Sequence, residues 1–270
     1  MPEIPDVDPD LLASGHVRAE RSGAVLTVTL DRPQARNAQT PTTWRALAAI
    51  GESLDDDVRV VVLRAEGESF SAGLDRAMFG EGLPGEPGLL ELARMAGDQL
   101  DETIAAFQRG FTWLADERVI SIAAVQGHAV GAGFQLALAC DLRIVADDAK
   151  FAMRETSLGL VPDLTGTAPL VRAIGYSRAL EVCVTGRWIG AEEASRIGLA
   201  SLRVERADLA QAVDDLVAAL TAPDAGAVRE TKALLAGATG RSDAEQHAAE
   251  RAAQGRRLAA LAALVANAGK

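Results

Sequence analysis

Two short apolar runs constrain the fold of this chain most. Arg59–Arg64 (RVVVLR) is a continuous β-branched run between two arginines, and Ile120–Val125 is a second, mostly apolar run. Such runs are typical of strands that are buried on both faces, as in a parallel sheet covered by helices. The second run leads almost directly into Gly131-Ala132-Gly133, so a tight turn must follow that strand.

The remaining pattern alternates strands with helices and then continues with helices alone. It predicts an α/β core at residues 1–200, in which 1–15 form a mobile leader, and a helical C-terminal region at 201–270. The stretch 78–88 is rich in Gly and Pro and is expected to be a loop. The other expected elements are a hairpin at 17–20 and 24–30, helices at 40–54, 89–114, 134–140, 177–186 and 191–198, a strand at 142–146, and helices from 209 onward.

Charge and cysteine content exclude several classes of function. The formal net charge is −11, from 27 basic and 38 acidic residues, whereas a nucleic-acid-binding surface is cationic. The two cysteines, Cys140 and Cys183, form neither a disulfide framework nor a metal-ligand spacing. The first ten residues do not resemble a signal peptide, and no apolar stretch is long enough to span a bilayer. We therefore expect a soluble cytoplasmic protein with no metal, no nucleic acid partner and no membrane span.

Two segments combine a buried strand, a glycine turn and a following helix, and these are the first candidates for a site. They are Phe70–Asp75 (FSAGLD) and Gly131–Leu136 (GAGFQL). Small residues let the backbone approach a ligand, and unpaired N–H groups at a helix start favour negative charge. Two such turns facing each other would form an oxyanion hole. The spacing alone favours a tight strand-to-helix connection without a ligand at each segment. A dinucleotide site is disfavoured because the third glycine of GxGxxG is missing.

Six motifs in order resemble the enoyl-CoA hydratase/isomerase (crotonase) superfamily, over about residues 17–200. Phe70–Asp75 looks like the first oxyanion segment of the family, usually FSAGAD, and Val125–Leu136 resembles VxGxAxGGGxxL. The other four are Arg32–Ala38 (RPQARNA), Cys140-Asp141, the block from Ala149 through Glu155 to Asp163, and Thr185-Gly186 with Ala191–Gly198.

This resemblance implies a spiral of ββα units with a helical C-terminal trimerisation region, assembled as a homotrimer or a dimer of trimers. It implies an acyl-CoA thioester as ligand, with coenzyme A as part of the substrate and no separate cofactor. It places the N–H groups of Leu74 and Ala132 in the oxyanion hole. The substrate-binding positions that it implies are Arg36, Ala72, Gly73, Asp75, Arg76, Gly131, Gly133 and Gln135, with Arg36 and Arg76 as partners for the CoA phosphates.

The carboxyl groups decide the expected chemistry. Hydratases of this family hold a water between two glutamates; the second matches Glu155, but the first falls on Gln135, whose amide cannot accept a proton at neutral pH. Asp163 stands where several isomerases of the family carry an acid or base. We therefore favour double-bond isomerisation by Glu155 and Asp163, with hydration by Glu155 as sole acid-base as the alternative. Without the resemblance, the local sequence favours a structural role in a turn for both carboxylates.

One alternative from another class of protein stays open beside an enzyme. A non-catalytic acyl-CoA-binding protein would keep the two turns and lose turnover. A serine peptidase is set aside, because no serine lies near Gly131 and Ser71 has no evident histidine partner. His128 is expected to be a packed, hydrogen-bonded loop residue. The alanine-rich end of the chain, 258–270, departs from the family pattern, and 80–88 is expected to lie near the acyl pocket.

Overall fold

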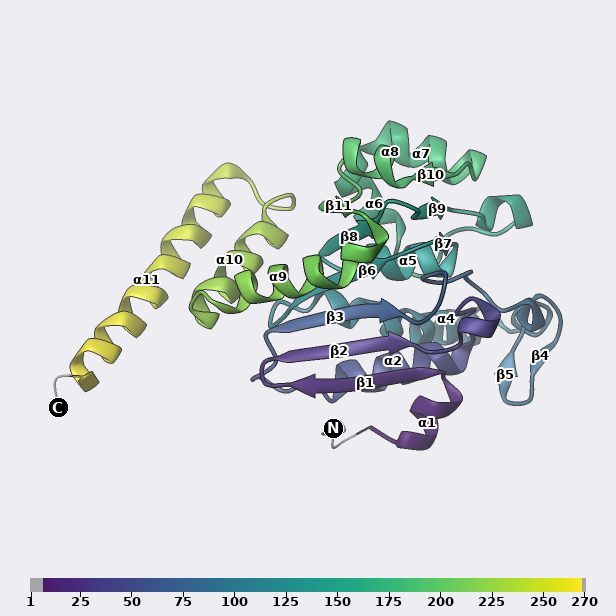
Figure 1. The fold of residues 1–270 in the computed structure, drawn as a ribbon, viewed down its shortest axis with the longest axis horizontal. Helices are drawn as coiled ribbons and strands as arrows, with labels where there is room; N and C mark the ends of the chain where they lie inside the picture. Colours follow the sequence, from purple (N-terminus) through teal and green to yellow (C-terminus); the bar gives the residue numbers. More distant parts are fainter. Residues whose placement is uncertain (1–6, 269–270) are drawn as a thin grey trace. The chain divides into compact units, whose positions relative to one another are not determined.

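The computed structural model describes residues 7–268 (Figure 1). These residues form two compact units that divide between Val217 and Ala218, and each unit is treated by itself. The mixed α/β class that the sequence predicts is confirmed.

The centre of the first unit is a six-stranded sheet. Its strand order is β1-β2-β3-β6-β8-β11, in which only the hairpin β1–β2 is antiparallel and every other neighbouring pair is parallel. The strands are β1 (Val17–Ser22), β2 (Val25–Leu30), β3 (Val60–Ala65), β6 (Ile120–Val125), β8 (Leu142–Ala146) and β11 (Leu202–Val204).

The two apolar runs form the middle of this sheet, as predicted. Val61 and Leu63 of β3 and Ile122 and Val125 of β6 are fully buried. Strands that are buried on both faces tolerate an uninterrupted apolar sequence, which explains why both were visible in the sequence.

A second, three-stranded sheet brings the glycine segments together. It pairs β7 (His128–Val130) in parallel with β9 (Lys150–Ala152), and β9 in antiparallel with β10 (Ile189–Gly190). His128 therefore lies in a short strand, and the prediction of a loop there was wrong. A parallel bridge also joins Ser71 to Ala129, which ties the first glycine segment to β7.

Helices α2 (Pro41–Glu52) and α4 (Gly97–Thr112) pack against each other beside the large sheet (Figure 1). Trp44 of α2 lies against Phe107 and Phe111 of α4, with ring centroids 4.8 and 6.1 Å away. Aromatic pairs in tilted contact bury a large apolar area, so this pairing anchors the two helices.

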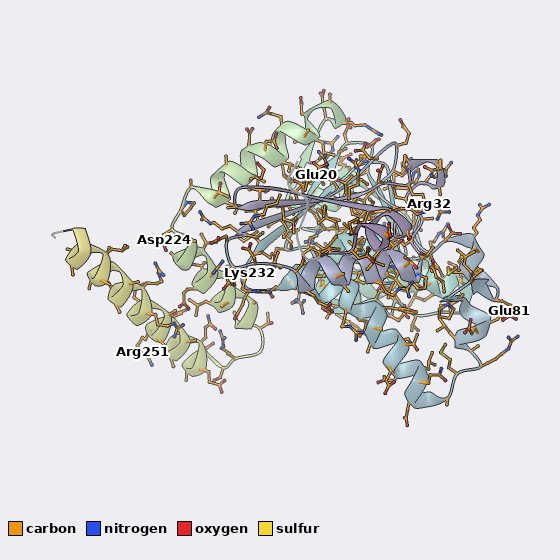
Figure 2. All side chains as sticks on the ribbon, turned by 90° about the horizontal axis from the view of Figure 1, so that it is seen from below. Glu20, Arg32, Glu81, Asp224, Lys232 and Arg251 are labelled. Atoms are coloured by element: carbon orange, nitrogen blue, oxygen red, sulfur yellow. The ribbon has the colours of Figure 1, made fainter. Side chains whose placement is uncertain are left out.

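The region 78–114 is more divided than the sequence indicates. The expected single helix is two helices, α3 (Leu89–Leu92) and α4, and the expected loop contains a 3-10 helix, η2 (Arg76–Phe79), and a small hairpin, β4 (Gly82–Leu83) with β5 (Glu86–Pro87). Both carboxylate oxygens of Glu81, labelled in Figure 2, accept from Arg94 in the turn after α3, at 2.8 and 2.9 Å. This exposed ion pair links the residue before the hairpin to the break between the helices.

The predicted mobile leader contains a short helix, α1 (Pro9–Ser14). The Asp8 carboxylate accepts from the Asp10 N–H at 2.9 Å, and Pro9 occupies the first turn. An Asp cap followed by proline is a helix start that the sequence contained. Residues 1–6 lie outside the described part of the chain.

The remaining elements of the first unit are helical connections. They are η1 (Pro33–Ala35), η3 (Trp113–Ala115), α5 (Ala132–Ala139), η4 (Glu155–Leu158), α6 (Thr167–Ile174), α7 (Tyr176–Thr185), α8 (Ala191–Arg196) and η5 (Arg206–Asp208).

The chain from Leu209 onward is helical, as predicted: α9 (Leu209–Thr221), α10 (Ala225–Gly237) and α11 (Asp243–Ala268). Within the second unit, α10 and α11 are joined by two ion pairs, Arg256 with Glu230 at 2.6 Å and Arg257 with Asp224 at 2.5 Å. Asp224, at the start of α10, and Arg251, on α11, are labelled in Figure 2. Among the described helices, none is long and apolar enough to cross a membrane.

Candidate functional site

A cavity of about 400 Å³ lies in the first unit, between the two glycine segments and the α2–α4 pair. Its size falls within the range of small-molecule sites. It is lined by Pro41, Trp44, Ala72, Gly73, Leu74, Met78, Phe79, Pro87, Leu89, Leu92, Ala93, Leu100, Ile104, Phe107, Val130, Gly131, Ala132, Gln135, Arg154, Glu155, Leu158, Leu160, Val161, Asp163 and Leu164.

The first glycine segment is held against the second by a close backbone approach. Gly73 has a φ of +86°, and a Cβ at this position would lie 2.4 Å from the Val130 carbonyl oxygen. Any larger residue would clash with the backbone and would also adopt an unfavourable left-handed conformation. Gly73 is therefore required for the two turns to face each other.

A buried hydrogen-bond network holds the first glycine segment against the residues that lead into α2. The Ser71 hydroxyl donates to the Asn37 carbonyl at 2.7 Å and accepts from the Gln39 amide at 2.9 Å. The Gln39 amide oxygen accepts from the Trp44 indole N–H at 2.8 Å. Buried and fully satisfied networks of this kind hold one conformation, so the turn is preorganised. Ser71 has a structural role here, in line with the rejection of a serine nucleophile.

The second glycine segment opens helix α5 beside a carboxylate. Gly131 has a φ of +51°, and a Cβ there would lie 3.3 Å from the Oε1 atom of Glu155. Ala132 is the first residue of α5, where backbone N–H groups have no partner within the helix. This turn thus places a helix N-terminus at the cavity.

Two N–H groups at these turns are unused. The parallel bridge between Gln39 and Leu74 consists of the Gln39 N–H donating to the Gly73 oxygen and the Asp75 N–H donating to the Gln39 oxygen, both at 2.8 Å. That pattern leaves out the Leu74 N–H. Within residues 7–268, neither it nor the Ala132 N–H has a protein acceptor. Both residues line the cavity, so two backbone donors are available to one ligand oxygen.

Glu155 is the buried carboxylate of the site. The residue is 9% exposed, and its Oε1 accepts from the Gln135 Nε2 at 2.7 Å. Its Oε2 is buried without a hydrogen-bond partner among the described residues. Burial raises the pKa of Glu155, the nearby charge of Asp163 raises it further, and the Gln135 hydrogen bond opposes both. A carboxylate with a raised pKa and one free oxygen suits proton transfer near neutral pH.

Asp163 lies at the same cavity and interacts with Glu155 through its charge. Burial raises the pKa of this carboxyl as well. Its backbone oxygen accepts from the Gln108 side chain of α4 at 2.7 Å, which fixes the loop that carries it. Two carboxyl groups with raised pKa values therefore share one cavity, a feature common at functional sites.

Gln135 is fully engaged. Its amide nitrogen donates to Glu155, and its amide oxygen accepts from the Leu164 N–H at 2.9 Å and the Gly166 N–H at 3.2 Å. The side chain is fully buried. Because both ends are held, the amide orientation is fixed and no free acceptor faces a reacting water. The sequence indicated that Gln135 is not a base, but it did not indicate these three partners.

The structure brings most of the predicted site residues to one cavity. Those that line it are Ala72, Gly73, Leu74, Gly131, Ala132, Gln135, Glu155 and Asp163. The other four lie outside its lining. Asp75 pairs with Arg32 and caps the Ala77 N–H at 2.9 Å, and Gly133 packs against Ser71. Arg36 and Arg76 are exposed.

His128 is packed and hydrogen-bonded, as expected, and does not line the cavity. Its Nδ1 lies 3.3 Å from the Ser69 hydroxyl, and its ring lies edge-on to Trp188 at 5.5 Å.

The apolar wall of the cavity was not among the predictions from the sequence. This wall includes Trp44 of α2 together with Leu100, Ile104 and Phe107 of α4. The spacing of the three α4 residues, four and then three positions, marks one face of a helix. That signal shows a buried face but not the surface against which it is buried.

Comparisons with known proteins agree with this geometry. Residues 20–260 match the family model described as enoyl-CoA hydratase/isomerase. The chain is 36% identical to the (E)-benzylidenesuccinyl-CoA hydratase of Thauera aromatica over 224 residues, 81% of this chain and 82% of the relative. It is 36% identical over 191 residues to the carnitinyl-CoA dehydratase of Escherichia coli K12, 70% of this chain and 68% of the relative.

Solved structures show the same fold. A Thermobifida fusca YX protein assigned as an enoyl-CoA hydratase, in complex with CoA, is 48% identical with a TM-score of 0.90 and covers 96% of this chain and 99% of its own. The same assignment is given to a structure in complex with acetoacetyl-CoA, also 48% identical with a TM-score of 0.90, which covers 94% and 99% of the two chains. The crotonase-like fold expected from the motifs is confirmed.

Proposed function

Because the chain belongs to the enoyl-CoA hydratase/isomerase family, we propose that it moves the double bond of an unsaturated acyl-CoA thioester. The thioester oxygen binds the N–H groups of Leu74 and Ala132, and Glu155 and Asp163 carry the protons. The observation that carries this proposal is the arrangement of two carboxyl groups with raised pKa values and two unused backbone donors around one cavity.

The oxyanion hole supplies the electrostatic part of the mechanism. Removing a proton from the α-carbon of a thioester places negative charge on the thioester oxygen. Two preorganised N–H groups stabilise that charge, and one such donor is commonly worth about 3 kcal/mol in the transition state. The start of α5 at Ala132 adds the favourable end of a helix dipole.

The proton transfers balance without a further reactant. Ionised Glu155 removes a proton from the second carbon of a 3-enoyl-CoA, and the electrons form an enolate with the double bonds conjugated. A carboxyl group, Asp163 or the now protonated Glu155, returns a proton to the fourth carbon. The double bond then lies between the second and third carbons, and the net mass is unchanged. Burial raises the pKa values of both carboxyl groups toward neutral pH, where a group can both accept and donate a proton.

The state of Gln135 favours isomerisation over hydration. Adding water requires a base that activates the water and an acid that protonates the carbon. Gln135 donates to Glu155 and accepts from two backbone N–H groups, so it offers no base for the water. Hydration by Glu155 as sole acid-base is the second candidate, since the relatives above are named as a hydratase and a dehydratase.

The test uses matched 2-octenoyl-CoA and 3-octenoyl-CoA with the purified protein, followed by mass and ultraviolet absorbance. Isomerisation of 3-octenoyl-CoA creates the conjugated thioester band at unchanged mass. Hydration of 2-octenoyl-CoA removes that band and adds the mass of water. Fast formation of the band with slow water uptake is expected, while the reverse ranking would establish hydration instead.

A third outcome would identify a different class of protein. Tight binding of both thioesters without turnover of either would indicate a non-catalytic acyl-CoA-binding protein. The proposal also includes a cytoplasmic homotrimer or dimer of trimers, with Arg36 and Arg76 near the CoA phosphates. The proposed chemistry uses carboxyl groups and backbone dipoles, and coenzyme A belongs to the substrate.

A further inference from the structure

Among the described residues that line the cavity, one carries a positive charge, and it is Arg154. This arginine directly precedes Glu155 and is exposed to solvent. A guanidinium has five N–H groups, and one of those on Arg154 donates to the Gly186 carbonyl at 2.8 Å. Within residues 7–268, the other four have no acceptor, and no carboxylate forms an ion pair with the guanidinium. Several donors and a full positive charge are therefore available to a ligand.

An arginine without an acidic partner stands out in this chain, which has 38 acidic against 27 basic residues. Arg187, in the turn after α7, shows the contrast, because it pairs with Glu181 and Glu193 at 2.5 and 2.8 Å. Glu155 follows Arg154 directly, yet neither of its carboxylate oxygens accepts a hydrogen bond from the guanidinium. Arg154 thus neither forms a surface ion pair with a described residue nor holds the carboxylate that is proposed as the base.

The Arg154 side chain is held in place by residues that follow α7. Its guanidinium carbon lies 5.6 Å from the centroid of the Trp188 ring, which is within the range of a cation–π contact. That ring is itself held edge-on to His128, with 5.5 Å between the centroids. Gly186 leaves room for the arginine, since a Cβ there would lie 3.4 Å from the Arg154 Cδ and 3.2 Å from the Met153 carbonyl oxygen. A side chain that is already ordered loses less conformational entropy when a ligand binds.

The chemistry of this group points to a carboxylate. A planar guanidinium with free N–H groups can hold a carboxylate through two parallel hydrogen bonds. Arg154 lines the same cavity as Leu74 and Ala132, whose N–H groups are assigned to the thioester oxygen. A second anionic group on the same ligand can therefore meet Arg154 within that cavity. It needs a cation there, because Glu155 and Asp163 give the cavity negative charge whenever they are ionised.

Resting on the function proposed above, we infer that the acyl group of the substrate carries a second carboxylate and that Arg154 binds it. The ligand is then a monothioester of coenzyme A with a dicarboxylic acid. Arg154 determines specificity and takes no part in the proton transfers. Uncharged thioesters such as octenoyl-CoA remain substrates, because Arg154 keeps its solvent and its contacts with Gly186 and Trp188 when no anion is bound.

Binding of matched saturated thioesters tests this inference without requiring turnover. Dissociation constants are measured by isothermal titration calorimetry on the full chain for the CoA monothioesters of butanedioic, hexanedioic and octanedioic acid. Each is paired with its neutral counterpart, in which a carboxamide replaces the terminal carboxylate. The two members of a pair have nearly the same size and shape, so the ratio of their dissociation constants isolates the charge. The different lengths cover different distances between the thioester and Arg154.

In at least one pair, the carboxylate is expected to bind about tenfold more tightly than the carboxamide, as one hydrogen bond between charged groups implies. Ratios near one at every length, or ratios that favour the carboxamide, would overturn the inference.

Variants identify the cation that is responsible. Arg154→Gln is expected to bring the ratio to about one. Arg154→Lys should keep part of the preference, because an ammonium retains the charge but not the planar pair of donors. Lys150→Gln is the matched control, since Lys150 is exposed in β9, lies outside the cavity lining and carries the same charge on the same segment. Equal loss of the preference in Lys150→Gln and Arg154→Gln would show a general effect of charge and would contradict the assignment. If Arg154→Gln does not fold, the ratios measured on the unmodified chain still decide.

A phosphate of coenzyme A is the alternative anion for Arg154. In that case Arg154→Gln would weaken both members of every pair by the same factor and would leave their ratio unchanged. Coenzyme A alone is therefore titrated into the unmodified chain and into Arg154→Gln. Equal weakening of coenzyme A and of all thioesters would assign Arg154 to a phosphate and overturn its assignment to the acyl group.

Failure of this inference and failure of the proposed function give different results. Preference for a carboxylate together with no turnover of 3-octenoyl-CoA, or of a 3-enoyl-CoA that carries a terminal carboxylate, would reject the proposed isomerisation and keep the role of Arg154. Turnover of 3-octenoyl-CoA with ratios near one in every pair would keep the isomerisation and reject the role of Arg154.

Discussion

Replacing Gln135 by leucine would remove the three hydrogen bonds that hold the site together. The substitution leaves the Glu155 Oε1, the Leu164 N–H and the Gly166 N–H without their partner in a buried region. A buried polar group without a partner costs about 1–3 kcal/mol. Leucine fills a similar volume, so the three groups together predict a loss of about 3–9 kcal/mol in the free energy of unfolding.

The same substitution should shift the pH dependence of turnover. The hydrogen bond from Gln135 lowers the pKa of Glu155 against the effect of burial. Without it, the pKa of Glu155 rises, and the carboxylate becomes available as a base only at higher pH. The acidic limb of the kcat/KM profile for 3-octenoyl-CoA is expected to move upward in pH.

Gln126 provides the matched control for both effects. Its amide donates to the Ala65 and Gly67 carbonyls at 2.8 and 3.2 Å, it is 7% exposed, and it does not line the cavity. Gln126→Leu is expected to lower the free energy of unfolding in urea while leaving the acidic limb in place. An unchanged unfolding midpoint and an unchanged limb in Gln135→Leu would refute the role assigned to Gln135.

The other predictions concern the carboxyl groups and the first turn. Glu155→Gln is expected to lower kcat by about a hundredfold or more, the contribution typical of a general acid or base, measured with 3-octenoyl-CoA. Because the folded-state pKa of Glu155 is raised, its charge destabilises the fold at neutral pH, and Glu155→Gln should unfold at a higher urea concentration there. This gain in stability should shrink as the pH falls toward 4.5. A gain that stays constant with pH would contradict the raised pKa. Asp163→Asn is expected to lower kcat/KM by about tenfold or more through loss of proton transfer; full activity would assign both transfers to Glu155. Gly73→Ala places a Cβ 2.4 Å from the Val130 oxygen at a φ of +86°, which predicts a loss of about 2–4 kcal/mol in stability together with loss of turnover. Gly127→Ala, with a similar clash against the Glu68 oxygen, should lose stability but keep the kcat of its folded fraction.

Local sequence patterns predicted those elements of the fold whose own residues show that they are buried. The runs at β3 and β6 were visible because strands buried on both faces need apolar residues at every position. The break between α3 and α4 was not predicted. Leu89–Leu92 and Gly97–Thr112 share a helical periodicity, and the ion pair of Glu81 with Arg94 at their junction joins residues that lie 13 positions apart.

The candidate site could be predicted from the sequence where the backbone conformation requires a particular residue. Glycine is required at Gly73 and Gly131 by their positive φ angles and close neighbours, so both turns stood out. The sequence did not reveal the backbone partners of Gln135. They are the N–H groups of Leu164 and Gly166, and every residue except proline carries such a group. The apolar wall brings α2 and α4 together from positions more than fifty residues apart, and no local pattern specifies that contact.

Glu155 is proposed to remove a proton from a thioester held by the Leu74 and Ala132 N–H groups, and the rest of the reaction depends on this transfer. Its most direct test is the conversion of 3-octenoyl-CoA in deuterium oxide, with the product examined by nuclear magnetic resonance. The unmodified chain is expected to form 2-octenoyl-CoA. Its fourth carbon should carry solvent deuterium, delivered by a carboxyl group that has exchanged with deuterium oxide. Glu155→Gln is expected to show neither product nor deuterium exchange at the second carbon. Rapid exchange at the second carbon by Glu155→Gln would show that another group removes the proton.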